Sequence, residues 1–185
     1  MFQIRIHGRG GQGVVTAAEM LSIAAFLEGR HAQAFPSFGS ERMGAPVISY
    51  CRIDDKEIRL REPIGEPDAV IIQDPTLLLS QPVFAGVKKT GYLMLNSGKT
   101  VAELGLTDFV KDFPSERVAL LDATGLALKH VGRPVPNAAL LGMFAAVTGQ
   151  IKLESVAAAV REKFPGAVGE ANVKAAAEAY EKAKG

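Results

Sequence analysis

Hydrophobic and polar positions alternate at the start of the chain and then change to a helical period. From Phe2 to His7, Phe, Ile and Ile alternate with Gln, Arg and His, which predicts a strand. Over 14–28 the apolar residues recur at helical spacing, and Gly29 follows in the position where glycine commonly ends a helix. A short strand is predicted over 31–35. The order of strand, glycine-rich turn, helix and strand predicts a right-handed parallel crossover.

Short apolar runs and polar turns alternate through the rest of the chain. The strand-like segments 47–53 and 57–60 flank a polar turn, which predicts an antiparallel hairpin. Three apolar runs that each end at a polar or glycine-containing turn predict strands buried on both faces, over 69–73, 92–95 and 118–121. Helical spacing predicts three helices, over 138–148, 153–163 and 170–184.

These elements include no repeat and no linker, so we expect one domain over residues 1–185. Its predicted class is α/β, with a single open, mostly parallel Rossmann-like sheet, flanking helices and an added antiparallel hairpin. A chain of 185 residues, of which 48% are hydrophobic, is long enough to bury one core of its own.

Composition narrows the classes of partner. Lys and Arg total 21 and Asp and Glu total 20, so no basic excess favours binding to nucleic acid or to an anionic membrane. No apolar stretch approaches the ~20 residues that span a bilayer, and the N-terminus enters a strand without the layout of a signal peptide. We therefore expect a cytoplasmic protein.

The chain has a single cysteine, Cys51, which limits its redox chemistry. One cysteine cannot form an internal disulfide and cannot complete a four-thiolate iron–sulfur site. Its strand-like surroundings predict a buried, apolar role for the side chain rather than a reactive thiol. Iron–sulfur chemistry, where this protein takes part in it, is therefore expected on other chains.

The glycine-rich turn over 8–13 is the first candidate for ligand binding. Gly8, Gly10 and Gly13 have the spacing of the phosphate loop in dinucleotide-binding folds, and the helix that follows offers free N–H groups to an anion. A turn that only packs a helix on a strand also needs glycines, so both interpretations stay open. NAD is disfavoured, because the segment 31–36 lacks the acidic residue that binds the ribose.

The loop over 37–45 is the second candidate. It holds Ser37, Ser40, Glu41 and Arg42 among glycines, and loops of this length in a compact domain are functional when they are not disordered. We expect it near the glycine turn, because both follow neighbouring strands at the same edge of the sheet. A docking or ligand-contact role is favoured over an ordinary surface loop.

Other polar residues have ordinary structural interpretations. Asp74 and Asp122 end predicted strands, where capping of the next turn is favoured over catalysis. The three histidines are far apart in the sequence and lack the spacing of a metal site. For His7, beside the glycine turn, packing or a backbone hydrogen bond is favoured over a functional role.

Two segments together carry a family resemblance. They run from Phe2 to Gly13, which includes Gly8-Arg9-Gly10-Gly11-Gln12-Gly13, and from Phe35 to Val47, which includes Gly39-Ser40-Glu41-Arg42-Met43-Gly44-Ala45-Pro46. The stretches 58–60, 67–71 and 136–142 fit as well. Over essentially its whole length, the chain resembles the gamma subunit of pyruvate:ferredoxin oxidoreductases and their 2-oxoacid relatives.

This resemblance implies a subunit that is inactive alone. The complex converts a 2-oxoacid and coenzyme A to an acyl-CoA and CO2, and its electrons pass to ferredoxin or another acceptor. The implied partners are alpha, beta and delta subunits, with thiamine diphosphate between alpha and beta, Mg on the partner subunits and iron–sulfur clusters on delta. The gamma chain itself carries none of these cofactors and is associated with the access of coenzyme A.

The resemblance also implies the site residues, which lie in the two loops: Gly8, Gly10, Gly11, Gln12, Gly13, Ser40, Glu41, Arg42 and Gly44. Arg42 is expected to be the one cationic group there that can meet a phosphate or a partner's carboxylate. Many relatives have a second arginine where Met43 stands, and this departure points to a branched or aromatic 2-oxoacid, with pyruvate as the default. Two alternatives remain: a stand-alone nucleotide-binding oxidoreductase and a purely structural subunit.

Overall fold

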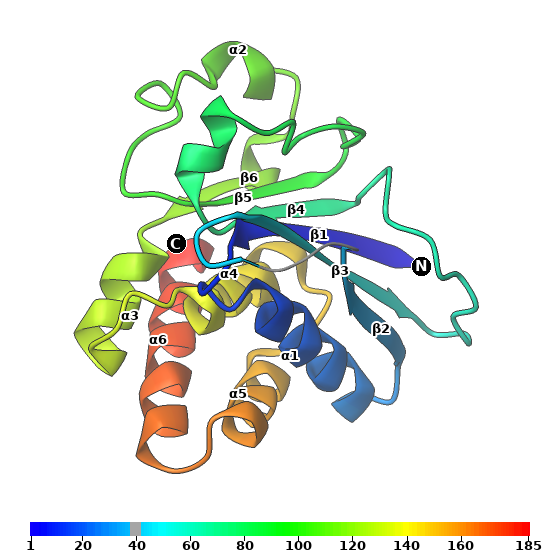
Figure 1. The fold of residues 1–185 in the computed structure, drawn as a ribbon, viewed down its shortest axis with the longest axis vertical. Coiled ribbons are helices and arrows are strands. Elements are labelled where there is room, and N and C mark those ends of the chain that lie inside the picture. Colours follow the sequence, from blue (N-terminus) through cyan, green and yellow to red (C-terminus); the bar gives the residue numbers. More distant parts are fainter. Residues whose placement is uncertain (38–41) are drawn as a thin grey trace.

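The computed structural model describes residues 1–37 and 42–185 as one six-stranded sheet in the order β2-β3-β1-β4-β5-β6, with helices packed against it (Figure 1). The strands are β1 (Phe2–Arg9), β2 (His31–Pro36), β3 (Pro46–Asp54), β4 (Ala69–Ile72), β5 (Tyr92–Asn96) and β6 (Val118–Leu121). The α-helices are α1 (Val14–Leu27), α2 (Thr107–Val110), α3 (Ala123–Val131), α4 (Asn137–Thr148), α5 (Leu153–Lys163) and α6 (Ala167–Lys184). Two short 3-10 helices are η1 (Pro75–Leu79) and η2 (Ser115–Arg117).

The sheet is mostly parallel, as the sequence predicted. Strands β1, β4, β5 and β6 run parallel to one another, whereas β3 is antiparallel to both β1 and β2. The α/β class and the open, mostly parallel sheet are therefore confirmed. The first crossover needs a correction, because β2 runs parallel to β1 but β3 lies between them.

The predicted hairpin of 47–53 with 57–60 is wrong. Residues 57–60 form no strand, and the antiparallel partners of β3 are β2 on one side and β1 on the other. Since both edges of β3 are already hydrogen-bonded, no edge is left for a returning strand. The added antiparallel hairpin of this fold is instead the β2–β3 pair.

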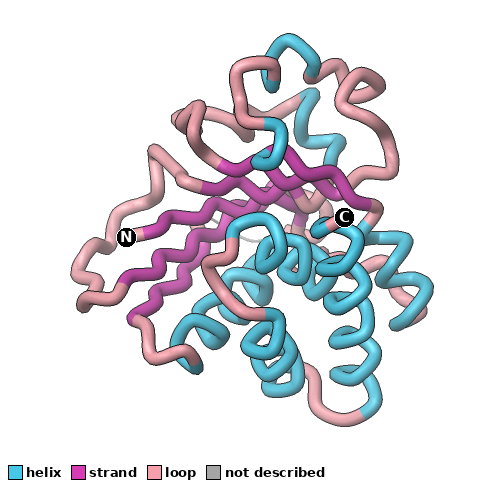
Figure 2. The backbone as a smooth tube through the Cα atoms, turned by 180° about the vertical axis from the view of Figure 1, so that it is seen from behind, coloured by secondary structure: helices cyan, strands magenta, loops and turns pink. Residues whose placement is uncertain are grey.

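The two faces of the sheet are covered differently (Figures 1 and 2). In β1, Ile4 and Ile6 face the larger core, which is built with α1 and the C-terminal helices, and the alternate residues Arg5 and His7 face the other side. A smaller core that includes Val70 and Leu77 lies under η1, α2 and their loops. Helices thus gather on one face, and irregular segments cover the other.

Two further elements differ from the sequence prediction. The polar turn predicted after β6 begins helix α3, because Asp122 caps its first turn by accepting from the N–H of Gly125 at 2.8 Å. Strand β6 was expected to be buried on both faces but is half-buried along its length, because it is an edge strand. Among the described residues, no helix is both long and apolar enough to cross a membrane.

Candidate functional site

The candidate site lies where the connections of the sheet diverge. From β1 the chain crosses to β2, at one edge of the sheet, whereas from β4 it continues to β5 and β6, toward the opposite edge. In open α/β sheets, ligands bind at such a switch point, outside the carboxyl ends of the strands. The glycine turn after β1 and the segment 73–76 after β4 meet there.

The second loop is seated directly on the glycine turn. Gly10 and Met43 form a parallel bridge, in which the N–H of Gly10 donates to Ala45 O at 2.9 Å and the N–H of Gly44 donates to Gly10 O at 3.0 Å. The predicted proximity of the two loops is therefore confirmed. It arises because β3 starts beside the end of β1, rather than from adjacent parallel strands.

At two positions of the turn, the backbone geometry requires glycine. A Cβ built on Gly10 would lie 2.1 Å from the carbonyl oxygen of Arg42, so only glycine lets the loop approach this closely. Gly13 has φ +73 and is the N-cap of α1, a left-handed conformation that glycine adopts without strain. Within the described part of the chain, no side chain caps this helix start. Its N–H groups can therefore meet an acceptor from outside the chain.

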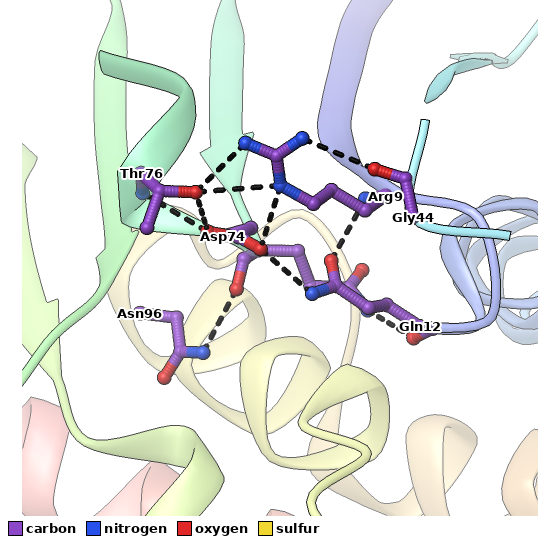
Figure 3. A network of polar contacts seen from close by, with 7 residues as sticks. Arg9, Gln12, Gly44, Asp74, Thr76 and Asn96 are labelled. Atoms are coloured by element: carbon purple, nitrogen blue, oxygen red, sulfur yellow. Dashed lines mark hydrogen bonds and ion pairs between the residues drawn. The ribbon is translucent and has the colours of Figure 1, made fainter. Parts of the chain in front are cut away.

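Gln12 connects the turn to the end of the neighbouring strand (Figure 3). Its side-chain Oε1 accepts from the N–H of Arg9 at 2.8 Å, and its Nε2 donates to Asp74 Oδ2, also at 2.8 Å. Gln73 donates in turn to the backbone carbonyl of Gln12. The glutamine of the motif therefore fixes the shape of the turn.

Arg9 lies in the same network. This cation was not predicted from the sequence, because it occupies a variable position of the glycine motif. Its guanidinium pairs with Asp74 at 3.2 Å, donates to Thr76 Oγ1 at 2.9 Å and donates to Gly44 O at 3.1 Å (Figure 3). Arg42 is therefore not the one cationic group at this edge. Arg9 ties the second loop to η1 through these bonds.

Asp74 has the capping role that was predicted for it. Its Oδ1 accepts from the backbone N–H of Thr76 at 2.9 Å and from the Thr76 hydroxyl at 2.6 Å. Partial burial raises the pKa of this carboxyl, but hydrogen bonds from Thr76 and Gln12 outweigh burial and hold the pKa below its ordinary value. Asp74 is thus a permanent anion that neutralises Arg9.

A polar cluster continues along the edge from β4 to α3. Asn96 donates to Gln73 O and to Thr124 Oγ1, each at 2.8 Å, and accepts from the N–H of Thr124 at 3.1 Å. The side-chain Oε1 of Gln73 is buried and has no donor among the described residues. A buried acceptor without a hydrogen-bond donor costs free energy, so this position at the end of β4 lacks a donor that a ligand could supply.

Two cavities adjoin along this edge. One has a volume of about 480 Å³ and lies between the glycine turn, Gln73 and the segment before α4. The other has about 460 Å³ and lies between η1 and the ends of β5 and β6, where Leu78, Leu104 and Lys99 are among the lining residues. Both are lined by Pro75, Asn96 and Thr124, so the two cavities are neighbours, and we refer to them together as the crevice.

The remaining predicted site residues lie as follows. Gly8 packs against Val14, and Gly11 lies under the Met43 side chain. Arg42 is exposed and makes no side-chain hydrogen bond or ion pair within 1–37 and 42–185, and Gly44 is exposed beside it. Met43 is 86% exposed above the turn. Ser40 and Glu41 lie outside the described residues.

His7 and Cys51 are buried away from this crevice. His7 accepts from Arg5 Nε at 2.9 Å, a side-chain rather than the predicted backbone partner, and burial followed by the nearby Arg5 charge lowers its pKa to about 3. Burial raises the pKa of the Cys51 thiol to about 12, which confirms the unreactive interpretation. Across the described ranges, no cluster of histidine, cysteine and carboxylate side chains could hold a metal ion.

Comparison with known proteins agrees with this fold and with the earlier resemblance. Residues 3–182 match the family described as pyruvate ferredoxin/flavodoxin oxidoreductase. The chain is 52% identical over 182 residues to a Thermococcus kodakarensis protein named pyruvate/ketoisovalerate oxidoreductases common subunit gamma, covering 98% of this chain and 97% of that one. It is 50% identical over 180 residues to pyruvate synthase subunit PorC of Methanocaldococcus jannaschii, covering 97% and 96%.

A solved structure gives the same result. The crystal structure of pyruvate oxidoreductase subunit PORC from Thermotoga maritima superposes with a TM-score of 0.81 at 35% identity, covering 97% of this chain and 95% of that one. The match therefore covers nearly the whole of both chains. The chain therefore belongs to the pyruvate ferredoxin/flavodoxin oxidoreductase family.

Proposed function

We propose that this chain is the gamma subunit of a complex that oxidatively decarboxylates a 2-oxoacid, forms an acyl-CoA and passes the electrons to ferredoxin or another acceptor. Family membership over nearly the whole chain supports this proposal. The relatives are named for pyruvate and ketoisovalerate, so these two acids are the first substrates to test. Residues 1–185 are proposed to act as one gamma-type domain in the cytoplasm.

The redox cofactors are assigned to partner subunits. The only cysteine, Cys51, is fully buried and its thiol stays protonated at neutral pH, so it is unsuited to bind a cluster. We therefore assign thiamine diphosphate and Mg to the alpha and beta subunits and the iron–sulfur clusters to delta. This chain supplies no catalytic group in the proposal, and its role is to bind and to position.

For the chain itself we propose contact with coenzyme A at the crevice. The observation that carries this proposal is a cavity of about 480 Å³ lined by the glycine turn and by Met43, which lies between the uncapped start of α1 and the loop that carries the exposed Arg42. A helix N-terminus and a guanidinium both attract phosphate, and coenzyme A carries phosphates at one end of a long flexible arm. The adjoining cavity of about 460 Å³ adds volume for the arm of such a ligand.

The residues of the two loops take different parts in this proposal. Gln12 and Gly13 shape the start of α1, whose N–H groups face the ligand, and Arg42 provides an exposed positive charge. Gly8 and Gly10 act by allowing close packing, and Gly11 and Gly44 line the loops. For Ser40 and Glu41, which lie outside the described residues, we propose contact with the ligand on the basis of the sequence alone.

A purely structural role is the second candidate, and close packing favours it. Gly8 and Gly10 are both required by protein atoms, namely the Val14 side chain and the Arg42 carbonyl, without any ligand. In this alternative the two loops only complete a docking surface for another subunit. The stand-alone nucleotide-binding alternative is disfavoured further. A dinucleotide fold needs the end of β2, which binds the ribose, directly beside β1, whereas here β3 lies between these two strands.

Affinity purification from the native host under anaerobic conditions tests the proposal. A tagged chain should bring down larger thiamine-binding and cluster-bearing polypeptides, and the purified assembly should form acyl-CoA from pyruvate or ketoisovalerate. Equilibrium binding of coenzyme A by the assembly, with and without this chain, then separates the two roles. A coenzyme A affinity that is unchanged when the chain is omitted favours the structural role, and recovery of a lone monomer counts against the assignment.

A further inference from the structure

A separate cavity of about 300 Å³ lies on the opposite face of β1 and β3 from helix α1. Its polar lining comes from Arg5 and His7 of β1, Tyr50 of β3, and Ser37 and Gln81 of the adjoining segments. The remaining lining is apolar and includes Leu77, Pro82 and Ile48. A mostly apolar hollow with a few convergent polar groups is the usual form of a small-molecule site.

Arg5 is the unusual group in this cavity, because it is a cationic residue that is only 6% exposed. It donates to His7 and to three backbone carbonyls, those of Ile64, Val83 and Ala85. No carboxylate of the described residues forms an ion pair with it, and one N–H of Nη1 is left without an acceptor there. Buried charges are normally paired with an opposite charge, and this guanidinium keeps one N–H free to donate to an anion.

The neighbours of Arg5 offer further donors and no negative charge. His7 uses Nε2 as an acceptor for Arg5, so the neutral ring carries its proton on Nδ1 as a donor. Tyr50 and Ser37 bring hydroxyl groups to the lining. Among the described lining residues none is acidic, and Arg5 and Tyr50 are the titratable groups that line the cavity with His7.

The apolar part of the lining decides the kind of anion. If the occupant were inorganic phosphate, its charged oxygens would lie against the apolar side chains of Leu77, Pro82 and Ile48. These side chains instead favour contact with a hydrocarbon group. We propose that this cavity binds a small organic carboxylate, with its charged end toward Arg5 and its short apolar body against Leu77 and Pro82. This site shares no lining residue with the crevice and does not depend on the coenzyme A proposal.

Thermal unfolding of the full chain tests the proposal with sodium isobutyrate as the probe. Binding at about ten times the dissociation constant lowers the unfolding constant about 10-fold, which is measured as a rise in Tm. Sodium chloride at equal ionic strength and isobutyramide, the neutral analogue of the same shape, should give no such rise. Equal stabilisation by isobutyramide or chloride, or stabilisation by sodium phosphate alone, overturns the proposal of an organic carboxylate.

The location is tested by NMR of the histidine rings. At pH 7, where isobutyrate is ionised and the His7 ring is neutral, saturating isobutyrate should shift the ring resonances of His7, which lines the cavity, while the exposed His31 serves as reference. Arg5→Leu should abolish the response to isobutyrate, and Arg59→Leu, at a side chain that is 85% exposed, should retain it. The wild-type NMR experiment decides where Arg5→Leu fails to fold: a change at His31 without one at His7 overturns the location.

A carboxylate from the chain itself is the remaining competitor. Glu41 lies outside the described residues but only four positions after Ser37 in the sequence. If the wild-type chain ignores isobutyrate and Glu41→Gln responds to it, the chain supplies its own counter-ion and the proposal of an external ligand is overturned. If both respond, the external site stands.

Discussion

Gly10 lies against the backbone carbonyl of Arg42, and a Cβ at Gly10 would come within 2.1 Å of that oxygen. The glycine turn and the second loop are therefore one packed unit rather than two independent loops. The hydrogen bonds between Gly10, Gly44 and Ala45 hold this unit together. A change at either loop is consequently expected to move the other.

Substitution of Gly10 tests this coupling. In Gly10→Val the new side chain overlaps the Arg42 carbonyl, so the loop over 42–45 must leave the turn. We expect the free energy of unfolding to fall by about 1–3 kcal/mol, the usual cost of overpacking, and the complex to assemble poorly. Gly65→Val is the matched control, because a Cβ there meets nothing within 4 Å. Normal thermal stability and normal turnover of Gly10→Val would show that the loop is not held at the turn.

Asp74 is expected to stabilise the edge of the sheet rather than to react. Asp74→Ala removes the cap of η1 and the partner of both Arg9 and Gln12. We expect a loss of about 1–2 kcal/mol in the free energy of unfolding, measured by denaturant titration of the full chain. Asp108→Ala is the control, since Asp108 is fully exposed and lies 3.9 Å from Lys111. Equal effects of the two substitutions would contradict the role of Asp74.

Burial of His7 predicts a specific dependence of stability on pH. The pKa of His7 is lowered to about 3 in the folded chain, so below the usual unfolded value the unfolded state binds one more proton. The contribution of this histidine is therefore complete above about pH 6.5 and is lost as the pH falls toward 3, by about 1.4 kcal/mol per pH unit. NMR of the His7 ring should find it neutral at pH 5. A His7 ring that is protonated at pH 5 would contradict the buried, neutral state.

The sequence predicted the parallel part of the fold well, because each of those strands is short, apolar and ended by a turn residue. It failed at β3, whose pairing depends on edges far away in the chain. The segment 57–60 has strand-like residues, but β1 and β2 already occupy both edges of β3. The local pattern of apolar and polar residues does not show which strand edges are already hydrogen-bonded to other strands.

The proximity of the two loops was predicted, but their connections were not. The glycine spacing and the loop composition were local signals, and both led to segments that the structure brings together at one edge of the sheet. Arg9 was missed because the motif treats its position as variable, and its partners Asp74 and Thr76 are distant in sequence. The buried pairing of Arg5 with His7 was likewise hidden, although their alternate spacing on one strand places both on one face.

Arg42 remains the residue on which the coenzyme A proposal depends most. Its side chain is exposed on the loop that packs on the glycine turn, whereas Arg9 is already engaged by Asp74, Thr76 and Gly44. A charge-assisted hydrogen bond to phosphate is worth about 1.5–3 kcal/mol. In the assembled complex, Arg42→Ala should therefore raise the apparent KM for coenzyme A by about 10-fold to 100-fold. The apparent KM for the 2-oxoacid should stay near its wild-type value.

Two comparisons make this last prediction decisive. Arg59→Ala removes another exposed arginine, one that pairs only with Glu57 among the described residues, and should change neither constant by more than about twofold. The isolated Arg42→Ala chain should unfold at the wild-type temperature, because the exposed Arg42 side chain makes no hydrogen bond or ion pair with residues 1–37 or 43–185. A variant that keeps its stability but needs more gamma subunit to reconstitute activity, at unchanged KM for coenzyme A, assigns Arg42 to a partner's carboxylate. Values of both constants within twofold of wild type would make Arg42 an ordinary surface residue and remove the main support for coenzyme A contact by this chain.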